Sequence, residues 1–191
     1  TERSISMTNV LESLTQTALG IALKAGAEAA DVITLEGSSV AVDIRGGTLE
    51  HAERAEGTDI GLRVLIGQKQ AIVSSSNTSE ATLKDMAERA VAMARIAPDD
   101  PYIGLADPAD LAKSWDIAAL ELADATPEPT PDALQDDARR AEATALAVVG
   151  VSQVQSASAG YGKNKVHLAT SGGFSGGYTR TSRSLSGVAI A

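Results

Sequence analysis

The chain has 191 residues, of which 43% are apolar and only 3% aromatic, and its 25 acidic and 16 basic side chains give a net charge of −9. A chain of this length can fold on an aliphatic core without a disulfide or metal, and the absence of cysteine excludes thiol nucleophiles and Cys-containing zinc sites. The negative charge argues against nucleic-acid and anionic membrane partners, and no apolar run is long enough to span a bilayer.

The N-terminal part of the chain predicts a helix followed by strands. Asn9 precedes Glu12 at capping-box spacing, apolar residues then recur at helical spacing, and Gly26 ends the helix. From Asp31 the apolar residues alternate instead, and glycines at 46–47, 57 and 67 are typical of turns. We expect an antiparallel meander of about four strands within the runs 31–36, 40–45, 48–54, 60–66 and 70–75.

A second helix is expected from Ser79 to Pro98, because its apolar residues form one continuous stripe. The stretch from Pro98 to Pro131 holds all six prolines and predicts a connector. Trp115 is the only tryptophan, and we expect it to anchor this connector by packing on a neighbouring element.

Thr130 and Pro131 predict the start of a third helix, with an apolar face of Leu134, Ala138, Ala141, Ala145 and Val148. Strands are expected at 151–159, 165–170, 174–183 and 185–190, separated by turns that include 160–164 and 171–173.

These elements predict an α+β fold of antiparallel meanders packed with three helices, in two α/β halves joined by the Pro-rich connector. The expected domains are 1–97, the connector 98–130, and the start of a second, central domain at 131–191. The chain begins with Thr1 and ends within an apolar strand. Because an unpaired strand edge is a liability, we expect a piece cut from a longer protein.

The two histidines do not match a known zinc pattern. His51-Ala52-Glu53 has the H-x-E letters of zinc deaminases but lacks the two cysteines those sites need. A zinc-peptidase helix needs two histidines four residues apart, whereas His51 and His167 are far apart and lie on predicted strands. Both are interpreted as ordinary strand side chains.

Other letter patterns also favour structural interpretations. Ser175 lies in a G-x-S-x-G pattern, but no helix follows it as a nucleophile elbow requires. The segment 160–163 lacks the Lys-Ser/Thr ending of a phosphate loop and predicts a hairpin turn. The carboxylates of Asp99, Asp100, Asp136 and Asp137 are expected in solvent. We therefore assign no catalytic, cofactor-binding or metal-ligating residue to this chain.

Five stretches, in family order, resemble the PmbA (TldE) branch of the TldD/PmbA family, whose members were once called modulators of DNA gyrase and are now interpreted as subunits of a zinc peptidase. One departure is Gly172, where asparagine is more usual in the family. The stretches span nearly the whole chain and are 25–32, 61–68, 90–95, 99–108 and 169–176.

The resemblance implies that this chain is the N-terminal portion of a non-catalytic subunit more than twice its length. A TldD-type partner would hold zinc through a His-Glu-x-x-x-His helix, and the two would form a heterodimer that cleaves small or unfolded peptides. A homodimer in the absence of that partner is left open. A cytoplasmic location is expected. The alternative hypothesis is a regulatory protein that binds a DNA topoisomerase and has no peptidase activity.

Overall fold

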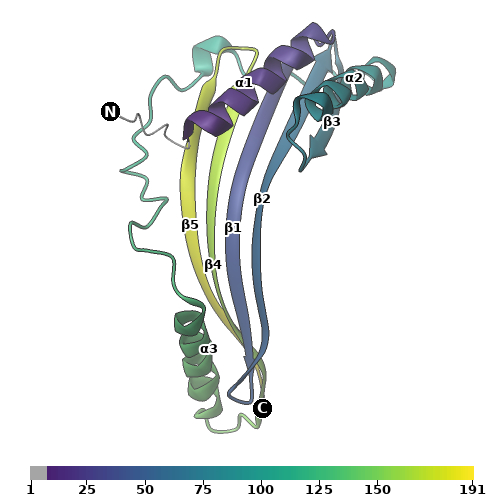
Figure 1. The fold of residues 1–191 in the computed structure, drawn as a ribbon. Coiled ribbons are helices and arrows are strands. Elements are labelled where there is room, and N and C mark those ends of the chain that lie inside the picture. Colours follow the sequence, from purple (N-terminus) through teal and green to yellow (C-terminus); the bar gives the residue numbers. More distant parts are fainter. Residues whose placement is uncertain (1–7) are drawn as a thin grey trace. The chain divides into compact units, whose positions relative to one another are not determined.

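The computed structural model describes residues 8–191, with side chains from Val10 onward. Over these residues the chain forms three α-helices, one short 3-10 helix and five strands (Figure 1). In chain order they are α1 (Thr8–Lys24), β1 (Ala29–Arg45), β2 (Thr48–Ile66), β3 (Lys69–Ser75), α2 (Glu80–Ile96), η1 (Pro108–Asp110), α3 (Pro131–Leu146), β4 (Gln153–Thr170) and β5 (Ser175–Ile190).

The strands form a single sheet in the order β3-β2-β1-β4-β5. Consecutive strands β2 and β3 pair antiparallel, with Ile60 opposite Ser75 and Ile66 opposite Lys69. The sheet therefore consists of two groups of consecutive strands, β1–β2–β3 and β4–β5. They meet where β1 lies beside β4. The predicted α+β class with antiparallel strands and three helices is confirmed, although one continuous sheet replaces separate meanders.

The described chain divides into two compact units that are not continuous in sequence. Unit 1 contains residues 8–36, 57–120 and 165–178, and unit 2 contains 37–56, 121–164 and 179–191. Each unit thus takes one part of β1, β2, β4 and β5, together with its own helices. The sequential domain boundaries 1–97, 98–130 and 131–191 stay a prediction.

Unit 1 buries one face of its part of the sheet under α1 and α2 (Figure 1). This core contains the alternate buried residues of β1 and β2. The buried stripe of α2 packs against them. The residues Ala87, Ala90 and Ala94 of α2 are fully buried, so this helix packs closely. Apolar core residues of the strands include Ala30, Val32, Ile60, Leu62, Val64 and Val73.

Unit 2 has a smaller core made by α3 on the alternating residues Val40, Val42 and Ile44 of β1. Leu134 and Ala138 of α3 are fully buried there, as predicted. Ala141 and Ala145 of the predicted face are half-buried. Val148 is wrong, because it lies beyond the end of α3 and is 57% exposed, and the helix instead buries a carboxylate, Glu142, one turn after Ala138.

The strands are longer than predicted because several glycines lie inside them. No turn forms at 57–59 or 160–164: β2 and β4 run straight through these residues, and β1 and β5 each merge two predicted strands. A Cβ on Gly160 would come within 3.0 Å of Ser184 Oγ, and one on Gly162 within 3.2 Å of Ser182 Oγ. These glycines leave room for the side chains of a neighbouring strand. In the sequence, a glycine with this role cannot be told from a glycine that forms a turn.

The remaining turns and caps agree with the sequence. Gly46 and Gly47 adopt φ values of 57° and 75°, as a type I′ hairpin turn requires. Ser79 and Thr130 cap α2 and α3 by accepting hydrogen bonds from main-chain N–H groups three residues on. The predicted cap at Asn9 involves a side chain outside the described part of the structure.

Candidate functional site

Ser175, within the G-x-S-x-G pattern, and His167, eight residues before it, are neighbours in unit 1. Ser175 begins β5 and His167 lies in the paired part of β4, and Ser175 Oγ is 3.4 Å from His167 Nε2. The Gln16 side chain of α1 donates to the same Ser175 Oγ at 3.2 Å. The fold therefore creates a serine–histidine pair that the sequence analysis had not joined.

The electrostatics of this pair do not suit a nucleophile. Burial lowers the pKa of His167, and only the Glu12 carboxylate opposes this effect, so the imidazole is neutral at pH 7. His167 Nδ1 is buried without a hydrogen-bond partner. An unpaired lone pair costs less there than an unpaired N–H, so the favoured tautomer carries its proton on Nε2. That nitrogen then donates to Ser175 Oγ, whereas a general base must accept from it.

Two further features separate Ser175 from a catalytic triad. No carboxylate orients His167, because its Nδ1 has no partner at all. Ser175 opens a strand, and no helix follows to make a nucleophile elbow. The geometry thus supports a structural role in which Gln16, Ser175 and His167 connect α1 to the sheet.

The two glycines that follow Ser175 have packing roles, whereas Gly173, the first glycine of the G-x-S-x-G pattern, has a φ of 101° and open space around it. A Cβ on Gly176 would lie 2.3 Å from Trp115 Cη2, and one on Gly177 would lie 2.2 Å from the carbonyl oxygen of Val166. Trp115 also stacks on Phe174, with ring centroids 5.6 Å apart. The prediction that Trp115 anchors the connector by packing is confirmed, and its contact explains why position 176 has no side chain.

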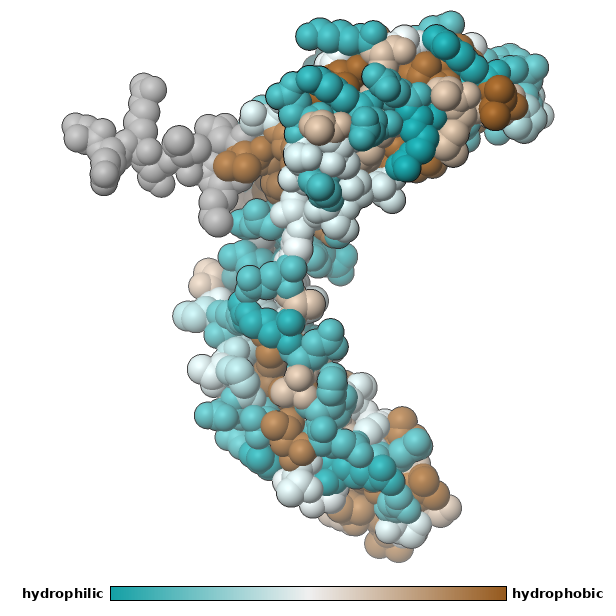
Figure 2. Space-filling view, turned by 45° about the vertical axis from the view of Figure 1, so that its right-hand side comes forward, coloured by the Kyte–Doolittle hydropathy of each residue, from teal (hydrophilic) through white to brown (hydrophobic). Residues whose placement is uncertain are grey.

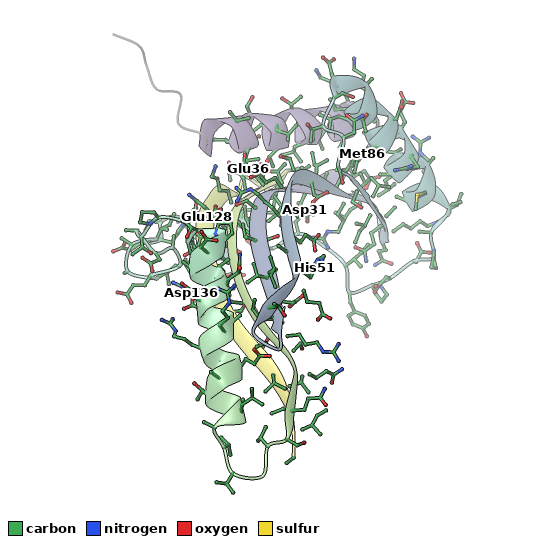
Figure 3. All side chains as sticks on the ribbon, turned by 60° about the horizontal axis from the view of Figure 1, so that its bottom comes forward. Asp31, Glu36, His51, Met86, Glu128 and Asp136 are labelled. Carbon is green, nitrogen blue, oxygen red and sulfur yellow. The ribbon has the colours of Figure 1, made fainter. Side chains whose placement is uncertain are left out.

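The second histidine does not form part of a metal site. His51 Nε2 lies 3.7 Å from Glu53 Oε2, and both side chains are more than half exposed. Figure 3 shows His51 on β2 and Asp136 on α3, where Asp136 pairs with Arg139 at 3.1 Å. Within residues 8–191 no group of three or more His, Asp or Glu side chains could hold a metal ion.

The other carboxylates singled out in the sequence have local roles. Asp100 Oδ1 accepts from the N–H of Tyr102 at 2.9 Å, which stabilises the turn after α2. Asp99 also lies in this turn region, after the end of α2. Asp137 is not in solvent as expected, because its side chain is only 14% exposed and bridges Arg140 of its own helix and Arg183 of β5. The structure brings none of these groups together around a cavity.

Glu142 is the polar residue that sequence reasoning missed. It is 4% exposed, and its two carboxylate oxygens each accept a hydrogen bond of 2.7 Å, from the main-chain N–H groups of Gly46 and Gly47. The carboxylate thus occupies the small anion site that the hairpin turn creates. The sequence offered one sign of this role: Glu142 stands four residues after Ala138, where the apolar stripe of α3 would continue.

A surface groove of about 480 Å³ lies between α1 and the start of α2. Its apolar residues are Val10, Leu14 and Leu83, and its titratable group is Glu80, which pairs with Lys84 at 2.7 Å. Its other lining residues are the hydroxyl side chains Ser13, Thr17 and Thr78. No helix over residues 8–191 combines the length and hydropathy needed to cross a bilayer.

Comparisons with known proteins place both halves of the chain in one family. Residues 30–94 match the family model for PmbA/TldA metallopeptidase domain 1, and residues 103–191 match the model for the PmbA/TldA metallopeptidase central domain. The fold and its matches therefore define part of a metallopeptidase-class protein. The chain belongs to the PmbA/TldD metallopeptidase family, as the resemblance predicted.

Individual relatives carry names from this family. The chain is 35% identical over 105 residues to a protein named metalloprotease PmbA homolog from Haemophilus influenzae, covering 55% of this chain and 23% of that relative. It matches the crystal structure of TldE from Thermococcus kodakarensis with a TM-score of 0.70 and 14% identity, over 90% of this chain and 38% of that one.

A structure from Bacteroides thetaiotaomicron, described as a modulator of DNA gyrase, gives a TM-score of 0.76 at 23% identity, over 91% of this chain and 39% of that one. At such identities the two structural matches establish a shared fold. This chain spans well under half the length of each of these relatives.

Proposed function

We propose that this chain is the N-terminal part of a PmbA/TldE-type subunit of a two-subunit zinc metallopeptidase that degrades or processes small or unfolded peptides. The observation that carries the proposal is a contrast. Both halves match metallopeptidase family models, yet residues 8–191 contain no group of three ligands for a metal ion. In this proposal the chain is a non-catalytic scaffold, and a TldD-type partner holds the zinc.

The scaffold would shape the chamber and the partner interface with its sheet. Its core is aliphatic and closely packed. Its buried polar contacts, such as Glu142 with the N–H groups of Gly46 and Gly47, hold α3 to the β1–β2 turn. A heterodimer with the TldD-type subunit is the proposed working form, and a homodimer in the absence of that partner is left open. We place the assembly in the cytoplasm.

The test combines the full-length subunit that contains this chain with a TldD-type partner. We expect peptide cleavage by the mixture, no cleavage by this subunit alone, and about one zinc ion per heterodimer. Cleavage by the partner that is unaffected when this subunit is omitted would contradict the scaffold role. Tight zinc binding by this subunit alone would contradict its non-catalytic nature.

The topoisomerase-binding alternative is not favoured. Two structurally similar proteins are described as modulators of DNA gyrase, but their identities of 23% and 15% establish only the fold. The net charge of −9 disfavours contact with DNA itself. A pull-down with purified gyrase separates the two proposals, since stable binding without any effect on peptide cleavage would support the alternative.

A further inference from the structure

The two halves of α1 are attached to the sheet of unit 1 by different kinds of contact. The C-terminal half packs Ala18, Leu19 and Ala22 into the aliphatic core that α2 shares. The N-terminal half is held instead by polar side chains, because Thr15 and Gln16 form hydrogen bonds with residues of β1 and β5. Apolar packing does not depend on pH, whereas a polar contact depends on the protonation state of the groups that make it.

Under the N-terminal half of α1, the polar residues Thr15, Thr34 and His167 lie together and are buried. Thr15 and Thr34 are fully buried, and their hydroxyl oxygens are 2.8 Å apart. Thr34 Oγ1 is also 3.5 Å from the main-chain oxygen of His167. At the rim of this cluster, Ser175 Oγ contacts both His167 Nε2 and the Gln16 side chain. The polar cluster, defined by these five residues, therefore connects α1 to β1, β4 and β5.

His167 is the member of the polar cluster that titrates near neutral pH, and its second ring nitrogen has no acceptor for a proton. The residue is 4% exposed, and Nδ1 is buried without a hydrogen-bond partner among the described residues. Because the neutral ring carries its proton on Nε2, protonation puts a charged N–H at Nδ1. A buried donor without a partner is costly, and a charged one is more so. Since this chain already encloses Nδ1, no outside group can supply the acceptor while α1 stays in place.

The charges near His167 do not remove this cost. Burial lowers the pKa of His167, and the exposed Glu12 carboxylate of α1 opposes this effect only in part. Lys165 lies two residues before His167 on β4, on the same face of the strand, and pairs at 2.6 Å with Glu36 of β1, which Figure 3 labels. From β5 the contact is the uncharged Ser175. Protonation of His167 is therefore unfavourable as long as α1 covers it.

We propose that protonation of His167 releases the N-terminal half of α1, residues 8–16, from the sheet, while the C-terminal half stays packed beside α2. Release lets water reach Nδ1 and hydrate the charge, which the closed arrangement prevents. The contacts of Ala18, Leu19 and Ala22 do not titrate, and they hold the rest of the helix. The inference rests on contacts within unit 1 and is independent of the proposed function.

Release has a defined direction in pH. Because the pKa of His167 is lower in the closed arrangement than in the released one, acid favours release. The free energy of release does not change with pH above the ordinary histidine pKa of 6.5. Below that value it falls as the pH falls, until the pKa of the closed arrangement is reached.

Release also changes the surface groove between α1 and α2. Val10, Ser13 and Leu14 line this groove from the released half of α1, and Leu83 lines it from α2. Acid therefore removes one wall of the groove. The polar cluster thus links the protonation of a buried histidine to the shape of the surface above it.

The test is residue-specific hydrogen exchange in the full-length subunit that contains this chain, expressed as protection factors at about pH 7.5 and about pH 5.5. Figure 2 shows hydrophobic residues among hydrophilic ones on the surface where Figure 1 places α1 and α2, so a dye for apolar surface would bind at both pH values.

We expect acid to lower the protection of amides 12–16 about fivefold or more, and that of amides 87–94 of α2 less than about twofold. Equal losses in both helices would show global destabilisation and overturn the proposal. Unchanged or increased protection of α1 would overturn it as well.

Two substitutions assign the effect to one histidine. His167→Gln keeps a polar side chain that does not titrate, so the protection of amides 12–16 should change less than about twofold between the two pH values. His51→Gln is the matched control, because His51 is exposed, and it should leave the full loss in place. A loss that persists in His167→Gln would overturn the proposal.

A further measurement applies if His167→Gln does not fold. In the parent protein, the loss of protection has to level off at the pH where NMR shows the His167 imidazole to titrate. A loss that continues through that pH would assign it to other groups and overturn the proposal.

Discussion

The indole ring of Trp115 lies directly against the Cα of Gly176, so that a Cβ on the glycine would come within 2.3 Å of Cη2 and 2.4 Å of Cζ2. This contact joins the connector to the start of β5 in unit 1. The glycine at position 176, inside the G-x-S-x-G pattern, is therefore explained by packing against Trp115 and not by a nucleophile motif. The energetic consequences of this contact can be measured directly.

Gly176→Ala should destabilise the protein by about 1–3 kcal/mol, because the new methyl group overlaps the Trp115 ring. Gly172→Ala is the matched control in the same loop region, since its Cβ would meet no atom closer than 3.6 Å, and it should cost less than about 0.5 kcal/mol. Urea unfolding followed by circular dichroism measures both. In a Trp115→Ala background the cost of Gly176→Ala should largely disappear, and a cost that persists would refute the contact.

Glu142→Ala should cost about 2–3 kcal/mol, because the N–H groups of Gly46 and Gly47 both lose their acceptor. Asp136→Asn on the same helix is the control. Its carboxylate is 69% exposed and pairs only with Arg139, so the cost should stay below about 0.5 kcal/mol. Thermal and urea unfolding measure the difference, and equal effects of the two variants would show that the turn does not depend on the carboxylate.

The pH dependence of stability should report His167. Since burial lowers its pKa in the folded state, the unfolded chain binds the proton more readily. The free energy of unfolding is therefore highest above the ordinary histidine pKa of 6.5 and declines as the pH falls below it, until the folded-state pKa is reached.

His167→Gln should remove this decline, whereas His51→Gln should leave it, because His51 is exposed. Urea unfolding at a series of pH values gives the slopes, and NMR titration of the two imidazoles assigns them. A decline between about pH 7 and pH 5 that survives His167→Gln would assign it to other groups.

Ser175→Ala should leave peptide cleavage by the two-subunit assembly unchanged and should lower stability by about 1 kcal/mol, because Gln16 and His167 lose a hydrogen-bond partner. A chelator should abolish cleavage by the parent and the variant alike, if zinc in the partner performs the chemistry. Loss of activity in Ser175→Ala at unchanged stability would instead make this serine a nucleophile.

Local features of the fold were predictable wherever neighbours in sequence determine the structure. The Ser79 and Thr130 caps, the Gly46-Gly47 turn and the buried stripe of α2 depend on short-range spacing, which one sequence displays. Glycines inside strands could not be distinguished from turns, because the close approach of Ser184 to Gly160 involves a strand far along the chain. The number and length of the strands were therefore wrong while the fold class was right.

By itself the sequence determined the aliphatic composition, the helix stripes, the absence of cysteine and the family resemblance, since all of these are properties of residue type and spacing. Only the tertiary structure decided that β1 and β4 are neighbours, that Ser175 meets His167, and that Glu142 fills the hairpin turn. Most of these contacts join residues separated by tens of positions, and the Ser175–His167 pair, eight residues apart, needs β4 and β5 to lie side by side. Their formation depends on the packing of the whole sheet and its helices, which no local pattern encodes.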